Sequence, residues 1–240
     1  MYIAIHIISI IIALAFSGYH GYKLGIGKAK SVLISVFCLM TCYIFVSAIP
    51  WFESGEIGSL NMVKIYAFTP PFYFLASKVF KVPFRNVCDL NGIWPMILFG
   101  LSHMACLIPK CCGGYVYLEG TKMCALAQAL TGTNMIPNQL MESIAGLIIA
   151  LAMFILAYKK DFKLNGRHYF IMIIVYGIQR FFWEFLRNNN KIIIFGEMTN
   201  AESGYFGLSD LSFYCIAMIA VGVVFIIALN IIDKKKGKEN

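Results

Sequence analysis

Two charged side chains lie inside an apolar stretch that is long enough to cross a membrane. In YGIQRFFWEFLRNNN, Arg180 and Glu184 are four residues apart, so they share one face of a helix. Charged residues at bilayer depth are costly and usually face the protein interior. Gln179 and Trp183 flank the pair, and Arg187 lies about one turn beyond Glu184. The pair could form a buried polar site that faces the bundle interior, or it could be a structural ion pair between helices.

A second polar group opens the preceding apolar stretch, TGTNMIPNQLMESIAGL. Pro137 suits a first helical turn, and Gln139 and Glu142 then share a face with Gly146. Glu142 could simply be stabilised by the dipole at a helix N-terminus. At the depth of Arg180, however, its carboxylate would also complete a cavity for a polar head group.

A histidine near the end of another apolar stretch lies close to cysteines, so a thiolate or metal role must be considered. In FGLSHMACLIPKCCGGYVY, His103 stands close to three cysteines. A lone His on an apolar helix is commonly a satisfied core residue, yet imidazole is also the usual general base. The nearby cysteines could pair or pack, but their spacing, C-x4-C-C-x11-C, matches no zinc pattern. We therefore predict no metal for Cys106, Cys111, Cys112 and Cys124.

The composition favours a membrane protein made of helices. The chain has 240 residues, of which 60% are hydrophobic and 13% charged, and the apolar residues fall in long runs. The net charge of +8 comes from short basic clusters between those runs, which favours membrane orientation over nucleic-acid binding. The first run has no basic segment before it and no small-residue cleavage site, so we predict a first transmembrane span that is retained and not a cleaved signal peptide.

We predict one all-α membrane domain, residues 1–240, with about seven transmembrane helices. A polar, Gly-rich loop over about 110–136 follows the fourth span. Pro70 and Pro71 predict that the third span is kinked or discontinuous. The expected spans are about 2–18, 31–52, 60–79, 90–109, 138–158, 168–187 and 211–232.

The distribution of basic residues predicts the orientation of the chain. Of the 20 Lys and Arg residues, 14 follow the first, third, fifth and seventh spans. The positive-inside rule places these segments in the cytoplasm. The N-terminus is therefore predicted outside and the C-terminus inside, and His103, Glu142, Arg180 and Glu184 fall in the outer halves of their helices.

Several segments together resemble the phosphatidylglycerol–prolipoprotein diacylglyceryl transferase family of bacterial inner membranes. IPNQLMESIAGL resembles the family's P-x-Q-L-Y-E-…-G stretch, and YGIQRFFWEFLR resembles its Y-G-…-R-x-x-x-E-F-x-R stretch. The basic loop KKDFKLNGRHYF and the later GLSDL also resemble family segments. This resemblance covers about residues 137–232.

The N-terminal half departs from the family pattern. The family signature is G-R-x-G-N-F-x-N-G-E, and some members end it G-C-C-Y-G. Lys110-Cys111-Cys112-Gly113-Gly114 fits that second ending. Aligned in this way, His103 takes the place of the signature Arg, Cys106 of its Asn and Cys111 of its Glu. The family's H-G-G segment is missing, and IYAFTPPFYFLA stands in its place.

The resemblance implies transfer of the diacylglyceryl group from phosphatidylglycerol to the lipobox cysteine of a prolipoprotein, in a bacterial plasma (inner) membrane and without a cofactor. It implies that Arg180 binds phosphate, that Glu184 holds Arg180, and that His103 is the best remaining base. The expected catalytic residues are His103, Glu142, Arg180 and Glu184, and the expected substrate-binding residues are Gln139, Arg180, Arg187 and Tyr2. The role of Tyr2 is inferred only from its position in the first span.

Two other functions remain open at this point. One is a catalytically silent relative of the same fold that binds lipid or a partner, which the missing signature Arg favours. The other is a membrane thiol oxidoreductase that draws on the four clustered cysteines, although the sequence has no clear C-x-x-C. A transfer assay with a lipobox peptide separates the first from the transferase, and thiol trapping tests the second.

Overall fold

The computed structural model describes residues 2–54, 62–109, 120, 122–134, 137–184, 208 and 210–236. These residues form helices and turns and contain no strand, which confirms the predicted all-α class. The helices are α1 (Tyr2–Lys23), α2 (Lys28–Ser54), α3 (Met62–Val79), α4 (Phe84–Leu90), α5 (Trp94–Ala105), α6 (Lys122–Thr131), α7 (Asn138–Lys159), α8 (His168–Glu184) and α9 (Asp210–Lys236).

Within the described residues, four helices are long and apolar enough to cross a membrane. They are α1, α2 over Lys28–Ala48, α7, and α9 over Leu211–Lys235. The other three expected spans fall on α3, α5 and α8. Of these, α5 has 12 residues, fewer than a membrane crossing commonly needs, and α8 has 17 within the described residues, at the lower end of the usual range. Seven spans therefore stay a prediction, as does the orientation.

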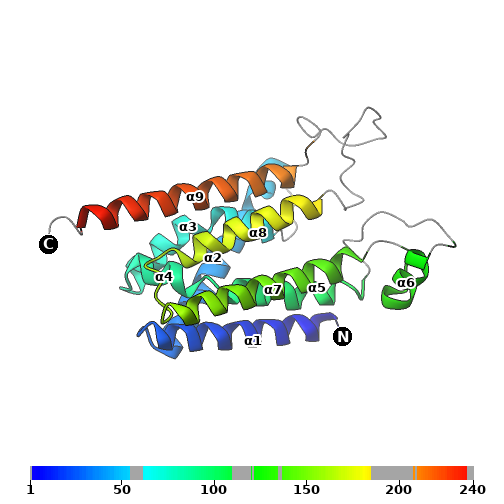
Figure 1. Cartoon of the computed structure of the whole chain (residues 1–240), viewed down its shortest axis with the longest axis horizontal. Helices are drawn as coiled ribbons and strands as arrows, with labels where there is room; N and C mark the ends of the chain where they lie inside the picture. Colours follow the sequence, from blue (N-terminus) through cyan, green and yellow to red (C-terminus); the bar gives the residue numbers. More distant parts are fainter. Residues whose placement is uncertain are drawn as a thin grey trace.

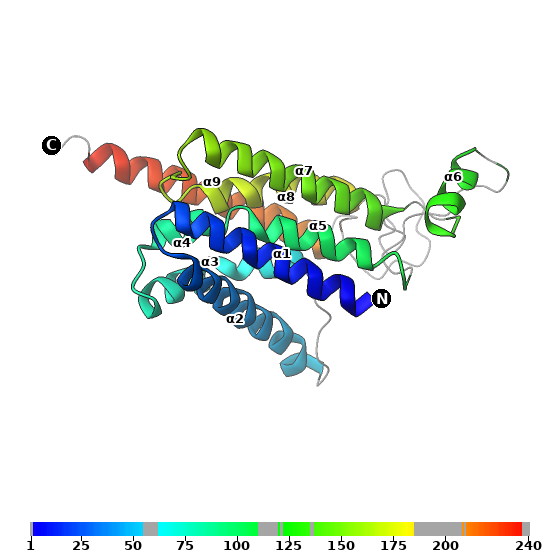
Figure 2. The ribbon, with the colours of Figure 1, turned by 90° about the horizontal axis from the view of Figure 1, so that it is seen from below.

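The main helices lie side by side in one bundle (Figure 1). Helix α8 packs on α9, α5 lies between α1 and α7, and α2 joins α1 to α3. The two termini lie at opposite ends of the bundle, and α6 lies beyond the end where the chain begins (Figures 1 and 2). The other end holds the α1–α2 turn, α4, the α7–α8 connection and the end of α9; we call it the basic end, after the lysines and arginines of those segments.

Helix α3 runs through both of its prolines without interruption, so of the two expectations a discontinuous helix was wrong, and a kink stays a prediction. Pro70 has no N–H to donate to the Tyr66 carbonyl one turn earlier. The Tyr169 hydroxyl donates to that carbonyl instead, over 2.6 Å. A side chain from α8 thus satisfies the backbone acceptor that the proline leaves open, and it ties α3 to α8.

The fourth expected span begins later than predicted and the polar loop is partly helical. Helix α4 ends at Leu90, and α5 starts only at Trp94. At Gly92, between them, an added Cβ would lie 2.2 Å from Cγ of His168, so the turn is packed directly on the α8 start. Such a long-range contact is not visible in local hydropathy. Helix α6 occupies Lys122–Thr131, inside the region expected to be a loop.

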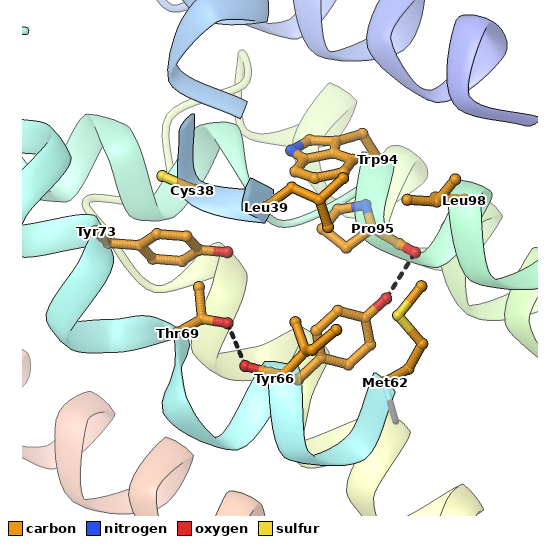
Figure 3. A pocket seen from close by; sticks show the side chains of 10 residues that line it. Cys38, Leu39, Met62, Tyr66, Thr69, Tyr73, Trp94, Pro95 and Leu98 are labelled. Atoms are coloured by element: carbon orange, nitrogen blue, oxygen red, sulfur yellow. Dashed lines mark hydrogen bonds between the residues drawn. The ribbon is translucent and has the colours of Figure 1, made fainter. Parts of the chain in front are cut away.

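Aromatic side chains connect the middle of the bundle to α8. A pocket between α2, α3 and α5 is walled by Tyr66, whose hydroxyl donates to the Pro95 carbonyl over 2.8 Å (Figure 3). The Tyr66 ring also meets Tyr176 of α8 edge-on, at 5.3 Å between centroids. Phe99 of α5 packs on the same Tyr176 ring at 5.0 Å. This stack fixes α3, α5 and α8 around the turn that precedes Arg180.

At the basic end, a buried carboxylate fixes the start of α8. Asp89 accepts hydrogen bonds from the backbone N–H of Leu164, at 3.1 Å, and of His168, at 3.2 Å. Burial raises the pKa of Asp89 to about 6, against the lowering effect of these hydrogen bonds. Nearby, Asp233 of α9 pairs with Arg85 and Arg167. Helices α4, α8 and α9 are thereby joined at one end.

Candidate active site

Helix α8 carries a buried ion pair at the end of the bundle opposite the basic end. Arg180 Nη2 lies 2.8 Å from Oε2 of Glu184, one turn further along the same helix. Both side chains are buried, with exposed fractions of 4% and 0%. The i, i+4 spacing predicted this shared face. Buried charges of this kind persist only when they are paired and hydrogen-bonded.

Helix α7 brings a second carboxylate to the same guanidinium. Arg180 Nη1 donates to Oε1 of Glu142 over 2.7 Å, and the Glu142 side chain is fully buried. The guanidinium therefore lies between two glutamates that are 42 residues apart in the chain. The structure confirms that Glu142, Arg180 and Glu184 lie together, while their depth in a membrane stays a prediction. It assigns Glu142 an ion-pair partner, not merely a helix dipole.

Helix α5 adds the histidine. His103 Nδ1 lies 3.3 Å from Oε2 of Glu142, so the two oxygens of one carboxylate contact two different cationic or donor groups. The His103 ring packs on Phe99 at 4.5 Å between centroids. At 17% exposure, His103 is the most accessible of the four side chains, and the other three are buried. We call His103, Glu142, Arg180 and Glu184 the polar cluster.

Small residues allow α5 and α7 to approach closely enough for these contacts. An added Cβ on Gly146 would lie 2.8 Å from Cδ1 of Phe99, and 3.2 Å from the Cα of Gly100. One turn earlier, the Ser143 hydroxyl donates to the Gly100 carbonyl across the same interface. Close helix contact of this type is typical of membrane proteins, where small residues line the interfaces. It sets the distance between His103 and Glu142.

The contacts of the polar cluster depend on one another. Within the described residues, Glu142 and Glu184 both contact the guanidinium of Arg180, in a region with little water to screen charges. The imidazole of His103 lies beside one of these carboxylates. An imidazole in such a position can act as a general base.

Other predicted residues fall in different places. Gln139 is buried one turn before Glu142, on the same helix. Tyr2 is 40% exposed at the start of α1, with its ring edge-on to His6 at 4.5 Å, so a substrate-binding role stays a prediction. Arg187 lies outside the described residues, as do Cys111 and Cys112. Cys106 is half-buried after α5, and Cys124 is buried in α6.

The sequence singled out neither Phe99 nor Tyr176 as site residues. Tyr176 is fully buried, one turn before Arg180, and Phe99 contacts both Tyr176 and His103. The signal available for Tyr176 was its position four residues before Arg180, because residues with this spacing share one face of a helix. Aromatic residues on an apolar helix are so common that this signal could not mark them out.

The sequence model of the prolipoprotein diacylglyceryl transferase family matches residues 65–228. That match runs from α3 to α9 and includes every helix of the polar cluster. The chain belongs to this family. It is 29% identical over 142 residues to phosphatidylglycerol--prolipoprotein diacylglyceryl transferase 2 of Clostridium perfringens (strain 13 / Type A). The aligned part is 58% of this chain and 49% of that relative, so the chain spans about half the length of the diacylglyceryl transferase it matches.

Proposed function

We propose that this protein transfers the diacylglyceryl group of phosphatidylglycerol to the thiol of a lipobox cysteine in a prolipoprotein. In this reaction the thiol gives up its proton, and the thiolate attacks the glyceryl carbon that bears the phosphate oxygen. A C–S bond forms as that C–O bond breaks, so the products are a thioether and glycerol phosphate. Such a reaction needs a base beside the thiol and a cation beside the departing phosphate.

The observation that carries the proposal is the contact between His103 and Glu142. His103 Nδ1 lies 3.3 Å from Oε2 of Glu142, and in the proposed reaction the other ring nitrogen, Nε2, takes the proton of the thiol. A carboxylate in that position also stabilises the imidazolium that forms when Nε2 takes a proton. Glu142 thus orients His103 as the base for the substrate thiol, and the proton later passes to the departing phosphate.

Arg180 supplies the cation for the phosphate. A guanidinium has five N–H donors in a planar fork, and the two ion pairs engage its terminal nitrogens from two sides. Its further N–H groups, including Nε, bind the phosphate oxygens. Glu142 and Glu184 hold the fork in one orientation before substrate arrives, which lowers the cost of binding.

Polar atoms next to Arg180 suit the remaining glycerol of the head group. Both amide atoms of Gln179 and Nε1 of Trp183 are shielded from solvent and have no hydrogen-bond partner among the described residues. The two residues are four apart on α8, so they share a face beside Arg180 and Glu184. Because buried polar atoms usually have a hydrogen-bond partner, these atoms are available to bind the head group in the proposed complex. With Gln139, they would donate to and accept from the glycerol hydroxyls.

The proposal includes the seven-span topology, with the polar cluster at the outer leaflet of a bacterial inner membrane. It is supported by the distribution of basic residues and by the termini at opposite ends of the bundle. Cysteine introduced at Glu202 should react with an impermeant maleimide added outside the cell. Cysteine introduced at Lys163 should react only after the membrane is opened, and the reverse pattern would contradict this topology.

Complementation tests the function in vivo. The wild-type gene should support growth of a bacterium depleted of its own diacylglyceryl transferase, and His103→Ala should not. A silent lipid-binding relative would fail to complement although it is present in the membrane. Cys111→Ser/Cys112→Ser should complement fully, because the substrate supplies the thiol; its failure at normal abundance would favour the thiol oxidoreductase.

A further inference from the structure

A groove runs along the outside of the α1–α2 hairpin near the basic end. It has a volume of about 620 Å³ and is open toward the surroundings. The two helices that form it are adjacent in Figure 2 and converge toward their connecting turn. Its lining residues are Leu14, Ala15, Gly18, Tyr19, Lys28, Ala29, Val32 and Leu33. The polar cluster lies at the opposite end of the bundle, so the groove is a separate feature.

Small residues form the groove, and a buried hydrogen bond keeps its floor apolar. Gly18 has no side chain, and a Cβ there would already touch Val32 at 3.4 Å. Ala15 and Ala29 leave the space beside it open. The hydroxyls of Ser17 and Ser35 are 2.6 Å apart and buried, so they draw the helices together without reaching the groove.

Lysines stand at the end of this apolar groove. The Lys28 ammonium lies 5.4 Å from the centre of the Tyr22 ring, and that of Lys23 lies 5.7 Å from the Tyr19 ring. Among the ion pairs of the described residues, neither lysine has a carboxylate partner. The sequence holds no Asp or Glu before Glu53. The aromatic rings therefore hold two uncompensated positive charges beside apolar surface.

We propose that the groove binds one acyl chain of an anionic phospholipid, with the phosphate on the Lys28 ammonium and close to Lys23. An acyl chain matches the apolar walls, and an anionic head group matches the charge at their end. Each basic residue near a membrane surface contributes about 1 kcal/mol of attraction to anionic lipid. This lipid sits in the leaflet at the basic end, and its binding does not depend on the transfer reaction.

A second copy of the hairpin fits the groove poorly. Symmetric pairing of two such surfaces would place Lys23 and Lys28 of one copy against the same residues of the other. With no acidic residue before Glu53 on either copy, like charges would meet without compensation. An anionic lipid removes that repulsion, whereas a second copy adds to it.

The test uses the full-length protein in nanodiscs that contain a trace of photoreactive phosphatidylglycerol, labelled on its acyl chain. Irradiation should attach the probe to residues between Leu14 and Leu33, mapped by mass spectrometry. Lys28→Gln should lower this labelling roughly fivefold. Lys30→Gln, two residues along and outside the groove lining, is the matched control and should leave it unchanged. Ala15→Leu/Ala29→Leu, which fills the groove, should abolish it.

Three results would overturn the proposal. One is equal labelling of the hairpin by photoreactive phosphatidylcholine, which has no net charge. Another is equal loss in the Lys28 and Lys30 variants, and the third is full labelling after the groove is filled. Arg180→Lys serves to separate this site from the proposed active site, because hairpin labelling should persist in that variant even if transfer is lost.

Discussion

Glu142 contacts Arg180 through one carboxylate oxygen, at 2.7 Å, and His103 through the other, at 3.3 Å. A single buried carboxylate therefore sets the position of the proposed phosphate ligand and of the proposed base. Movement of Glu142 would change both distances together. Glu184 contacts the same guanidinium from α8 and makes no ion pair with the histidine within the described residues.

The two glutamates should therefore differ in their effect on activity. Glu142→Gln removes the charge that orients and stabilises protonated His103, so we expect a loss of about 100-fold or more in kcat/KM. Glu184→Gln keeps a carbonyl oxygen that can accept a hydrogen bond from Arg180, so it should lose about tenfold or less. Initial rates of transfer to a lipobox peptide check this order. Equal losses in two folded variants would contradict the role given to Glu142.

Two substitutions of Arg180 should separate its contribution to stability from its contribution to catalysis. Arg180→Ala leaves two buried carboxylates without a cation, so it should destabilise the fold by about 3–5 kcal/mol. Arg180→Lys keeps the charge but loses the planar fork, so the protein should fold and transfer poorly.

A triple variant, Arg180→Met/Glu142→Gln/Glu184→Gln, is the control for stability. It removes all three buried charges, so its thermal unfolding temperature should lie closer to the wild type than that of Arg180→Ala. It should have no transfer activity. Activity in the triple variant would show that the polar cluster is structural.

Gly146→Ala should harm the site by way of Phe99. The new methyl group would lie 2.8 Å from the Phe99 ring, which packs directly on His103. Overpacking of this kind commonly costs about 1–3 kcal/mol, and we expect a reduced unfolding temperature with reduced activity. Ile144→Ala, on the exposed face of the same helix, is the control and should change neither by much. Equal effects of the two variants would contradict the close packing of α5 on α7.

The stability of the protein should depend on pH through Asp89. Its pKa is about 6 in the folded protein and about 4 when unfolded, so the folded state holds the proton more tightly. Protonated Asp89 therefore contributes about 2–3 kcal/mol to the free energy of unfolding. This contribution is fully present below about pH 4 and is lost as the pH rises through 6. Asp89→Asn removes that dependence. Unfolding measured in detergent between pH 4 and 7 should show a slope in the wild type that the variant lacks.

Local sequence signals predicted much of the polar cluster. The i, i+4 spacing placed Arg180 and Glu184 together, and similar depth placed Glu142 near them, as the structure confirms. Which oxygen of Glu142 meets which partner depends on how α5, α7 and α8 rotate about their axes. That rotation is set by Gly146, Ser143 and Tyr176, whose contacts join segments far apart in the chain.

The errors in the predicted fold have similar causes. Pro70 and Pro71 were expected to kink or interrupt α3, but the helix is continuous, and a hydroxyl on Tyr169, about a hundred residues later, satisfies the carbonyl that Pro70 leaves open. The break before α5 depends on Gly92 packing against His168. Hydropathy cannot detect either contact, because both depend on which helices become neighbours. The roles of Tyr2 and Arg187 stay predictions.

Transfer by the purified protein tests the central claim most directly. The full-length protein in nanodiscs of phosphatidylglycerol would be mixed with a fluorescent lipobox peptide, and the thioether product and glycerol phosphate would be measured. We predict both products in equal amounts from the wild type. His103→Ala should form neither, although it still folds and binds the lipid. Wild-type protein that is folded and lipid-bound but forms no thioether, or a His103→Ala variant with wild-type rates, would contradict the account.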